Sequence, residues 1–227
     1  DWSSDVCSSD LMTANDVTNL WLAEALFRMG AVRFGHFTLG RSTVGSPIYI
    51  DPKVLLGEPR VLARVGELIK TEIDAGMARR GRRVQPFDMV AGVPFGGLHL
   101  ATAYALLANV PLIYAQPPSD MDHGPKIEGR YRSGATVLII DDLMTTGGSI
   151  LETQRALQDV GLVVHDAIVL IDRAQGGADR LRVAGVHVSS ILNLTQMLNF
   201  YQSHEMIGDE DYRRSIEYVQ THRASVE

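Results

Sequence analysis

The segment 137–149 places two carboxylates and a glycine–threonine turn between an apolar run and an amphipathic run. The apolar residues before Asp141 predict a buried strand, and residues 150–157 have helical spacing. Between them lie Asp141, Asp142 and the turn Thr145–Ser149. Backbone N–H groups and hydroxyls of such a turn, at the positive end of a helix, form a cradle for a phosphate group. The segment therefore predicts a strand, a phosphate-binding turn and a helix.

The two acids limit the kind of ligand that this turn can hold. Because carboxylates repel phosphate, Asp141 and Asp142 are expected to face hydroxyl groups or a divalent cation. A phosphorylated sugar with free hydroxyl groups suits both halves of the segment. The turn has neither the Gly-Lys-Ser/Thr end of a P-loop nor the Gly-x-Gly-x-x-Gly pattern of dinucleotide-binding folds. The alternative is an ordinary strand–turn–helix unit with a polar tip.

Strands and helices alternate from residue 88 onward. The predicted strands are 89–91, 111–115, 137–140, 167–171 and 186–192, and the helices between them are 98–108, 149–160 and 178–184. This alternation predicts an α/β fold with a doubly wound, mainly parallel sheet flanked by helices, which binds ligands at the carboxyl ends of its strands. Before it we expect a helix at 20–29, a hairpin-like region at 34–51 and a long helix at 52–75, and after it an amphipathic helical region at 195–219, interrupted near 208–211.

The sequence of residues 1–11 is unlike the rest of the chain and matches the translation of a common sequencing-library adapter, so Met12 is the expected start. We expect one domain over 12–227, with a small N-terminal hood at about 12–52, a core at about 53–195 and C-terminal helices at about 195–222. Cys7, the only cysteine of the chain, lies in the first segment. The remaining sequence offers no disulfide and suits a reducing cytoplasm.

Charge and hydropathy argue against two classes of partner. The formal net charge is −6, so the composition does not indicate the basic surface that binds nucleic acid. We therefore expect no nucleic-acid partner. The longest charge-free stretch, 89–119, is interrupted by glycines and prolines. No uninterrupted run reaches the roughly 20 apolar residues that a membrane span needs, so we expect no membrane partner.

The acid pair and its turn closely resemble the phosphoribosyl pyrophosphate (PRPP) motif of type I phosphoribosyltransferases, and residues 20–220 resemble the orotate phosphoribosyltransferases. Residues 34–39 and 45–51 resemble the hood whose residue pair covers the orotate ring. Residues 92–97 resemble the pyrophosphate loop, and 172–177 the loop whose arginine holds the orotate carboxylate.

The resemblance implies a set of site residues and partners. For PRPP they are Asp141, Asp142, Leu143, Met144, Thr145, Thr146, Gly147, Gly148, Ser149 and His123; for orotate, Tyr49, Ile50, Thr145 and Arg173; and in the pyrophosphate loop, Pro94, Phe95, Gly96 and Gly97. It implies catalytic roles for Asp141, Asp142, His123 and Lys126, a magnesium ion bound through PRPP near the two aspartates, and a homodimer.

The segment 116–130 departs from the family pattern. Asp122-His123-Gly124 matches the mobile catalytic loop, but Pro117 and Pro118 stand where the family has Arg-Lys, and Met121 stands at the loop lysine. His123 and Lys126 remain as cations. A unit charge about 4 Å from a phosphate oxygen is worth on the order of 4 kcal/mol at an effective dielectric constant of 20. We therefore expect low turnover with PRPP binding partly preserved.

The function that the resemblance implies is transfer of the 5-phosphoribosyl group from PRPP to orotate, giving orotidine 5′-monophosphate and pyrophosphate. The alternatives are a divergent phosphoribosyltransferase for another base, a non-catalytic PRPP or nucleotide sensor, and an interaction subunit that a complete paralogue supplements. Lys53, at the expected start of the helix 52–75, is interpreted as a solvated side chain.

Overall fold

The computed structural model describes residues 19–39, 43–79, 83–117 and 126–222, so the expectations for residues 1–11 and His123 lie outside it. A six-stranded sheet forms the centre, in the order β5-β4-β3-β6-β7-β8. Its strands are β3 (Met89–Gly92), β4 (Leu112–Ala115), β5 (Ile127–Glu128), β6 (Thr136–Met144), β7 (Val163–Asp172) and β8 (His187–Asn193). Only the β4–β5 pair is antiparallel in this sheet.

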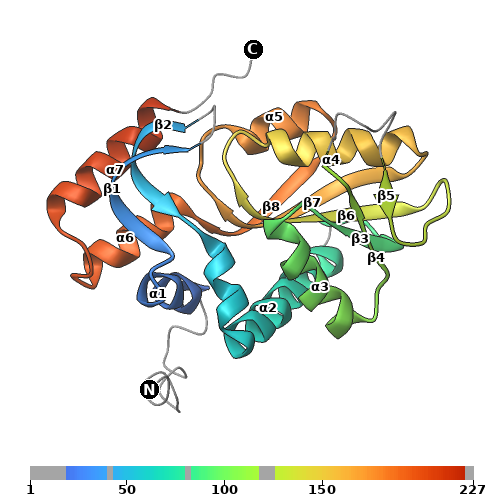
Figure 1. Cartoon of the computed structure of the whole chain (residues 1–227), viewed down its shortest axis with the longest axis horizontal. Coiled ribbons are helices and arrows are strands. Elements are labelled where there is room, and N and C mark those ends of the chain that lie inside the picture. The colour runs from blue at the N-terminus through green and yellow to red at the C-terminus, as the bar shows by residue number, and fades with distance from the viewer. Residues whose placement is uncertain (1–18, 40–42, 80–82, 118–125, 223–227) are drawn as a thin grey trace.

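Helices cover both faces of the sheet, as the predicted fold class requires (Figure 1). One face carries α2 (Pro59–Ala78) and α3 (Gly96–Ala108), and the other carries α4 (Gly148–Asp159) and α5 (Gly177–Val183). Because successive strand residues point to opposite faces, β6 supplies both apolar cores. Leu138 and Ile140 belong to the core on one side, and Val137 and Ile139 to the core on the other.

A second, antiparallel sheet of two strands lies at one end of the molecule (Figure 1). It consists of β1 (Val32–Leu39) and β2 (Thr43–Ile50). Helix α1 (Leu20–Arg28) contacts β1, α7 (Asp209–Thr221) contacts β2, and α6 (Leu194–Ser203) packs against both helices. The Tyr201 hydroxyl donates a 2.8 Å hydrogen bond to the carbonyl oxygen of Ala23. The predicted hood is present, and the helices near the other end of the chain share its core.

The expected helix over 52–75 is wrong as a single helix. A 3₁₀ helix, η2 (Pro52–Gly57), comes first, and α2 begins only at Pro59. Glu58 between them is extended, with φ −124° and ψ 76°. The physical reason is Pro59, whose ring disfavours helical backbone at the preceding residue.

Two strand boundaries also differ from expectation. The polar segment 116–130 contains β5, which pairs with β4 through Tyr114 and Ala115. Strand β6 continues through both acids to Met144, so Asp141 and Asp142 lie within the strand rather than after it. Strand β5 is too short to show an apolar periodicity, and the end of β6 contains charged residues. Neither feature can therefore be detected from the pattern of apolar residues.

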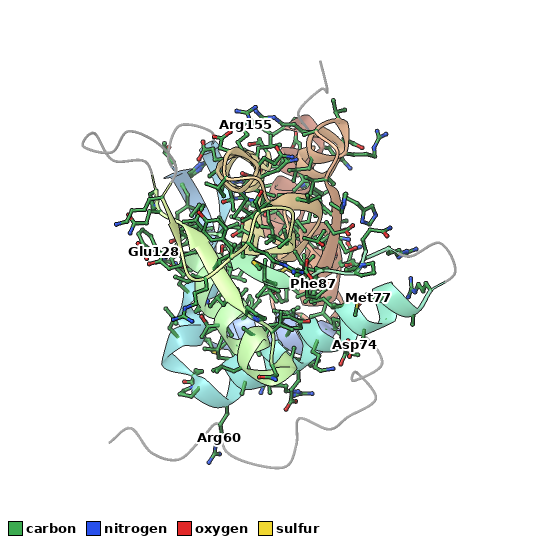
Figure 2. All side chains as sticks on the ribbon, turned by 90° about the vertical axis from the view of Figure 1, so that its right-hand side faces the viewer. Arg60, Asp74, Met77, Phe87, Glu128 and Arg155 are labelled. Atoms are coloured by element: carbon green, nitrogen blue, oxygen red, sulfur yellow. The ribbon has the colours of Figure 1, made fainter. Side chains whose placement is uncertain are left out.

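Surface and interior separate as expected for a globular chain. Figure 2 shows Arg60, Asp74, Glu128 and Arg155 pointing outward from the ribbon.

No helix in the described ranges is long and apolar enough to cross a bilayer.

Candidate active site

The chain order of the sheet places a topological switch point at the carboxyl ends of β3 and β6. These strands are neighbours, but the chain leaves β3 toward β4 on one side and leaves β6 toward β7 on the other. Open α/β sheets bind ligands at such a switch point, outside the carboxyl ends of the strands. The predicted pyrophosphate loop follows β3, and the predicted phosphate turn follows β6.

Three helices begin at this edge without side-chain caps. Helices α3, α4 and α5 follow β3, β6 and β7, and they start at Gly96, Gly148 and Gly177. The first N–H groups of a helix have no acceptor within it, and they carry the positive end of its dipole. Since no side chain occupies these positions, the N-terminal groups of α3 and α4 can bind anions on both sides of the switch point.

Two close approaches join the loops at this edge. A Cβ atom on Gly96 would lie 2.0 Å from Oδ2 of Asp142, and one on Gly177 would lie 2.6 Å from the Thr145 carbonyl oxygen. The Pro94–Phe95 peptide bond is cis, and the Phe95 side chain is exposed. The pyrophosphate loop is therefore in direct contact with the acid pair, and the loop 172–177 is in direct contact with the phosphate turn.

The acid pair is buried, and neither carboxylate forms an ion pair within the described part of the chain. Asp141 and Asp142 are 4% and 9% exposed, and the Asp142 N–H donates a 2.9 Å hydrogen bond to Asp141 Oδ1. Burial, and then the charge of Asp142, raise the pKa of Asp141 well above its usual value. Among the described residues no basic side chain lies within 4.0 Å of either carboxylate. Uncompensated carboxylates of this kind suit a hard cation or ligand hydroxyl groups.

The acid pair fits a magnesium ion that is shared with a ligand. The described residues contain no group of three or more His, Cys, Asp or Glu side chains close enough to hold a metal ion by themselves. Mg²⁺ prefers oxygen ligands and commonly takes one or two carboxylates together with phosphate oxygens and water. Asp141 and Asp142 would supply the protein's share of such a set.

Lys53 lies at this edge, in η2, and its interpretation as a solvated side chain is only half right. The side chain is 52% exposed, but Nζ lies 2.7 Å from Asp51 Oδ1. The Tyr49 hydroxyl donates a 3.2 Å hydrogen bond to the other oxygen of Asp51. The hydrogen bond with Asp51 raises the pKa of Lys53, and Asp142 adds to the rise. Asp51 Oδ1 also accepts the Lys53 N–H at 3.2 Å and thereby caps η2. The sequence Asp-Pro-Lys is the signal from which the contact between Asp51 and Lys53 could have been predicted.

Two further polar side chains were not found from the sequence. His99 lies in the first turn of α3, and its Nε2 atom is buried without a hydrogen-bond partner. Burial lowers the pKa of His99, against the opposing effect of the Asp142 charge. Arg180, in α5, donates a 3.3 Å hydrogen bond to the Thr146 carbonyl oxygen in the phosphate turn. Both residues are close to the start of a helix that follows a ligand loop, which is the signal that could have identified them.

Arg173 connects the loop after β7 to the hood. The side chain is 1% exposed, and its Nη2 atom donates to Ser46 Oγ at 2.9 Å and to the Ile48 carbonyl oxygen at 3.5 Å. Its Nε atom is buried without a partner. Burial lowers the pKa of the guanidinium. A buried guanidinium with an unused N–H can bind a carboxylate.

The predicted orotate contacts in the hood, Tyr49 and Ile50, lie close to Arg173 in the folded protein. Ile50 is buried, and the partly buried Tyr49 ring packs 5.5 Å from the ring of Phe37. The Arg33 guanidinium lies 4.6 Å from the centre of the Tyr49 ring. Tyr49 is thus held between neighbours on β1 and by its hydroxyl contact with Asp51.

The predicted lid is described only in part. Lys126 directly precedes β5, is 57% exposed, and has its Nζ atom 3.4 Å from Glu128 Oε1. The structure therefore places the Lys126 ammonium against β5.

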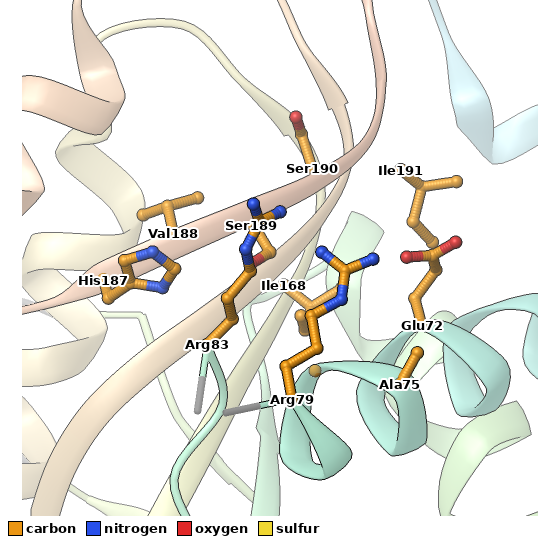
Figure 3. Close-up of a pocket in the computed structure, with 11 residues that line it drawn as sticks. Glu72, Ala75, Arg79, Arg83, Ile168, His187, Val188, Ser189, Ser190 and Ile191 are labelled. Carbon is orange, nitrogen blue, oxygen red and sulfur yellow. The ribbon is translucent and has the colours of Figure 1, made fainter. Parts of the chain in front are cut away.

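A cavity of about 280 Å³ lies away from this edge, between the end of α2 and strand β8 (Figure 3). Its polar lining consists of Glu72, Arg79, Arg83, His187, Ser189 and Ser190. None of the candidate site residues lines it, so it is a separate feature of the molecule.

Comparison with known proteins identifies the family of this chain. Residues 55–186 match the model of the phosphoribosyl transferase domain family. The chain is 34% identical to the orotate phosphoribosyltransferase of Pyrobaculum islandicum, covering 87% of this chain and 97% of that protein. It is also 34% identical to the uridine 5′-monophosphate synthase of Bos taurus, covering 92% of this chain but only 42% of that longer protein.

A solved structure has the same fold. The orotate phosphoribosyltransferase of Aeropyrum pernix superposes with a TM-score of 0.68 at 30% identity, covering 82% of this chain and 99% of that one. The family model covers the sheet from η2 to the start of β8, which includes both ligand loops and the acid pair. The chain therefore belongs to the phosphoribosyltransferase family, and within it to the orotate phosphoribosyltransferases.

Proposed function

We propose that this protein transfers the 5-phosphoribosyl group from PRPP to orotate, forming orotidine 5′-monophosphate and pyrophosphate. The observation that carries the proposal is the buried, uncompensated acid pair between two uncapped helix N-termini at the switch point. Such an edge offers anion sites on both sides of a site for hydroxyl groups or a cation, which matches a sugar with a phosphate at each end. The names of the relatives support orotate as the base.

Each part of the edge has a role in this reaction. The turn Thr145–Ser149 at the start of α4 binds the 5′-phosphate, and Asp141 and Asp142 accept hydrogen bonds from the ribose hydroxyls. Positive charge develops on the ribose ring as the bond to pyrophosphate breaks, and the two carboxylates stabilise it. Gly96 and Gly97 allow the backbone of the pyrophosphate loop to approach the substrate closely.

The base is held by the hood and by the loop after β7. The unused N–H of Arg173 binds the orotate carboxylate, and the Tyr49-Ile50 pair covers the ring, with Thr145 at its edge. His123 and Lys126 belong to the closing lid in this proposal. Bound magnesium would offset the charge of the pyrophosphate group near Asp141 and Asp142.

We also propose a homodimer and a cytoplasmic location. Helix α3 and the loop before it expose large apolar side chains: Phe95 is 75% exposed and Leu106 is 80% exposed. Exposed apolar side chains grouped on one element are typical of a surface that a second protein covers. The cysteine-free sequence after residue 11 supports the reducing compartment.

A second function has support from the lid sequence. Residues 116–125 contain no lysine or arginine, so a lid drawn from them brings little charge to the departing pyrophosphate. This favours a protein that binds PRPP and turns over slowly, or one that binds without catalysis.

The test combines a product assay with binding measurements on Arg173→Ala. The wild type should form orotidine monophosphate from orotate and PRPP with magnesium present. Loss of a charge-assisted contact costs roughly 1.5 to 3 kcal/mol, so the variant should bind orotate about 10- to 150-fold more weakly while PRPP affinity changes little. Arg155→Ala on the exposed face of α4 is the control, since Figure 2 shows Arg155 pointing outward.

The outcomes separate the alternatives. Equal losses for both ligands, with a lowered melting temperature, would show that Arg173 only joins the hood to the sheet. PRPP binding by the wild type without product from orotate would favour the second function.

A further inference from the structure

The ligand edge of the sheet has few sources of fixed positive charge. The sequence has no lysine or arginine in segments 93–97, 116–125 and 145–149, which follow β3, β4 and β6. The same edge carries the carboxylates of Asp141 and Asp142. A diphosphate group that binds there adds further negative charge, and this charge is costly unless cations offset it. Lys126, which directly follows the second segment, pairs with Glu128 on β5, so a further cation for this group comes from another element.

Lys53 lies where that cation is needed. The short helix η2 packs against both α3 and β6, and the Lys53 charge is close enough to His99, in the first turn of α3, to affect its pKa. Gly96 in that turn faces the Asp142 carboxylate at contact distance. The Lys53 ammonium interacts electrostatically with Asp142 and with His99. Three elements thus bring one ammonium group, one carboxylate and one helix N-terminus together.

The Lys53 ammonium is held in place by Asp51 and keeps N–H groups that can bind a ligand. Asp51 accepts a hydrogen bond from the Tyr49 hydroxyl on one oxygen and pairs with Lys53 on the other. An ammonium has three N–H groups, and the contact with Asp51 engages one side of it. Because half of the side chain is exposed, the remaining N–H groups are accessible to a ligand. A cation fixed in this way loses little conformational entropy when an anion binds.

We propose that Lys53, together with the free N–H groups at the start of α3, binds the pyrophosphate group of PRPP, and that Asp51 is its positioning residue. The inference rests on the proposed phosphoribosyl transfer. In that reaction the bond between the anomeric carbon and the pyrophosphate oxygen breaks, and the electron pair stays on the oxygen. A ring nitrogen of orotate forms the new bond to the carbon, and the proton of its N–H group leaves to water. Lys53 keeps its proton throughout and stabilises the charge on the leaving oxygen.

The competing explanation is purely structural. In it Lys53 fixes Asp51 and thereby Tyr49, and the hood weakens when the pair is broken. The two explanations differ in the ligand that loses affinity. Orotidine monophosphate occupies the base, ribose and 5′-phosphate subsites but has no pyrophosphate group, so it reports on the hood alone.

The experiment measures binding of inorganic pyrophosphate and of orotidine monophosphate by calorimetry, with magnesium present. Lys53→Met removes the charge and keeps the length of the side chain, and Lys53→Arg keeps the charge. Lys70→Met is the matched control, because Lys70 is an exposed lysine on α2 that pairs with Asp74 one turn away. Melting temperatures verify that each variant is folded.

We expect Lys53→Met to bind pyrophosphate at least tenfold more weakly, which corresponds to about 1.4 kcal/mol. Its affinity for orotidine monophosphate should stay within threefold of wild type, and Lys53→Arg should recover most of the pyrophosphate affinity. Lys70→Met should bind both ligands as the wild type does.

Unchanged pyrophosphate affinity in Lys53→Met, or an equal loss for orotidine monophosphate, would overturn the role of Lys53 and leave the proposed function standing. A wild-type protein that binds neither ligand would overturn both. A wild type that binds pyrophosphate through Lys53 but fails to bind orotidine monophosphate would support this inference and refute orotate as the base.

Discussion

Asp141→Asn should stabilise the ligand-free protein and abolish its PRPP binding. Asp141 is 4% exposed and has Asp142 as its neighbour, with no basic side chain within 4.0 Å among the described residues. Asparagine has nearly the same shape, and its Oδ1 atom can accept the 2.9 Å hydrogen bond from the Asp142 N–H. The substitution therefore removes a buried charge and retains the local contact.

The magnitude follows from the charges. Two unit charges about 5 Å apart interact by about 3 kcal/mol at an effective dielectric constant of 20, and burial adds a cost of its own. Protonation limits the penalty, because each unit by which the pKa of Asp141 is raised is worth about 1.4 kcal/mol. We expect Asp141→Asn to raise the free energy of unfolding by about 1 to 3 kcal/mol at pH 8.

The pH dependence has a definite sign. A carboxyl whose pKa is raised by folding holds its proton more tightly in the folded state, so ionisation destabilises the folded protein. The gain from Asp141→Asn should be absent below about pH 3, where the carboxyl is protonated in both states. It should grow as the pH rises toward the folded-state pKa of Asp141 and stay constant above it.

Urea unfolding at several pH values, without magnesium, measures this gain, and calorimetry with magnesium and PRPP measures the loss of binding. Asp74→Asn is the control: Asp74 is an exposed acid paired with Lys70, and Figure 2 shows it at the surface, so its removal should change stability by less than about 1 kcal/mol. A variant that is no more stable than wild type at pH 8, or that binds PRPP undiminished, would refute the assignment of Asp141 as an uncompensated ligand-binding acid.

Two further predictions concern the loops around the acid pair. Gly97→Ala should destabilise the protein by about 1 to 3 kcal/mol and weaken PRPP binding, because its Cβ would lie 2.3 Å from a backbone carbonyl oxygen of β6. Gly57→Ala, where a Cβ meets nothing within 4 Å, should do neither, and equal melting temperatures for the two variants would contradict the close packing. Replacing Pro117, Pro118 and Met121 by Arg, Lys and Lys should raise turnover at least tenfold, about 1.4 kcal/mol, and the gain should shrink with added salt. A triple variant with no gain in steady-state rate would show that the native lid is already sufficient.

The sequence alone determined the class of fold, and it predicted the ligand chemistry at the phosphate turn. Two acids followed by Thr-Thr-Gly-Gly-Ser, between a strand and a helix, form a local unit whose chemistry depends on residues adjacent in the chain. Strand–helix alternation from residue 88 implied a parallel sheet, since each crossover needs a helix. The hood and the break between α6 and α7 were also predicted from residues adjacent in the chain.

The tertiary structure decided which distant residues meet this unit. Lys53 and Asp142 are far apart in the chain, and only the packing of η2 on α3 and β6 brings them together. Arg173 was expected at the orotate carboxylate, but its burial and its hydrogen bond to Ser46 depend on how the hood folds over β7. The raised pKa of Asp141 likewise arises from burial, which no local pattern encodes. Sequence motifs specify contacts within a few residues, whereas desolvation and long-range charge pairing exist only in the folded chain.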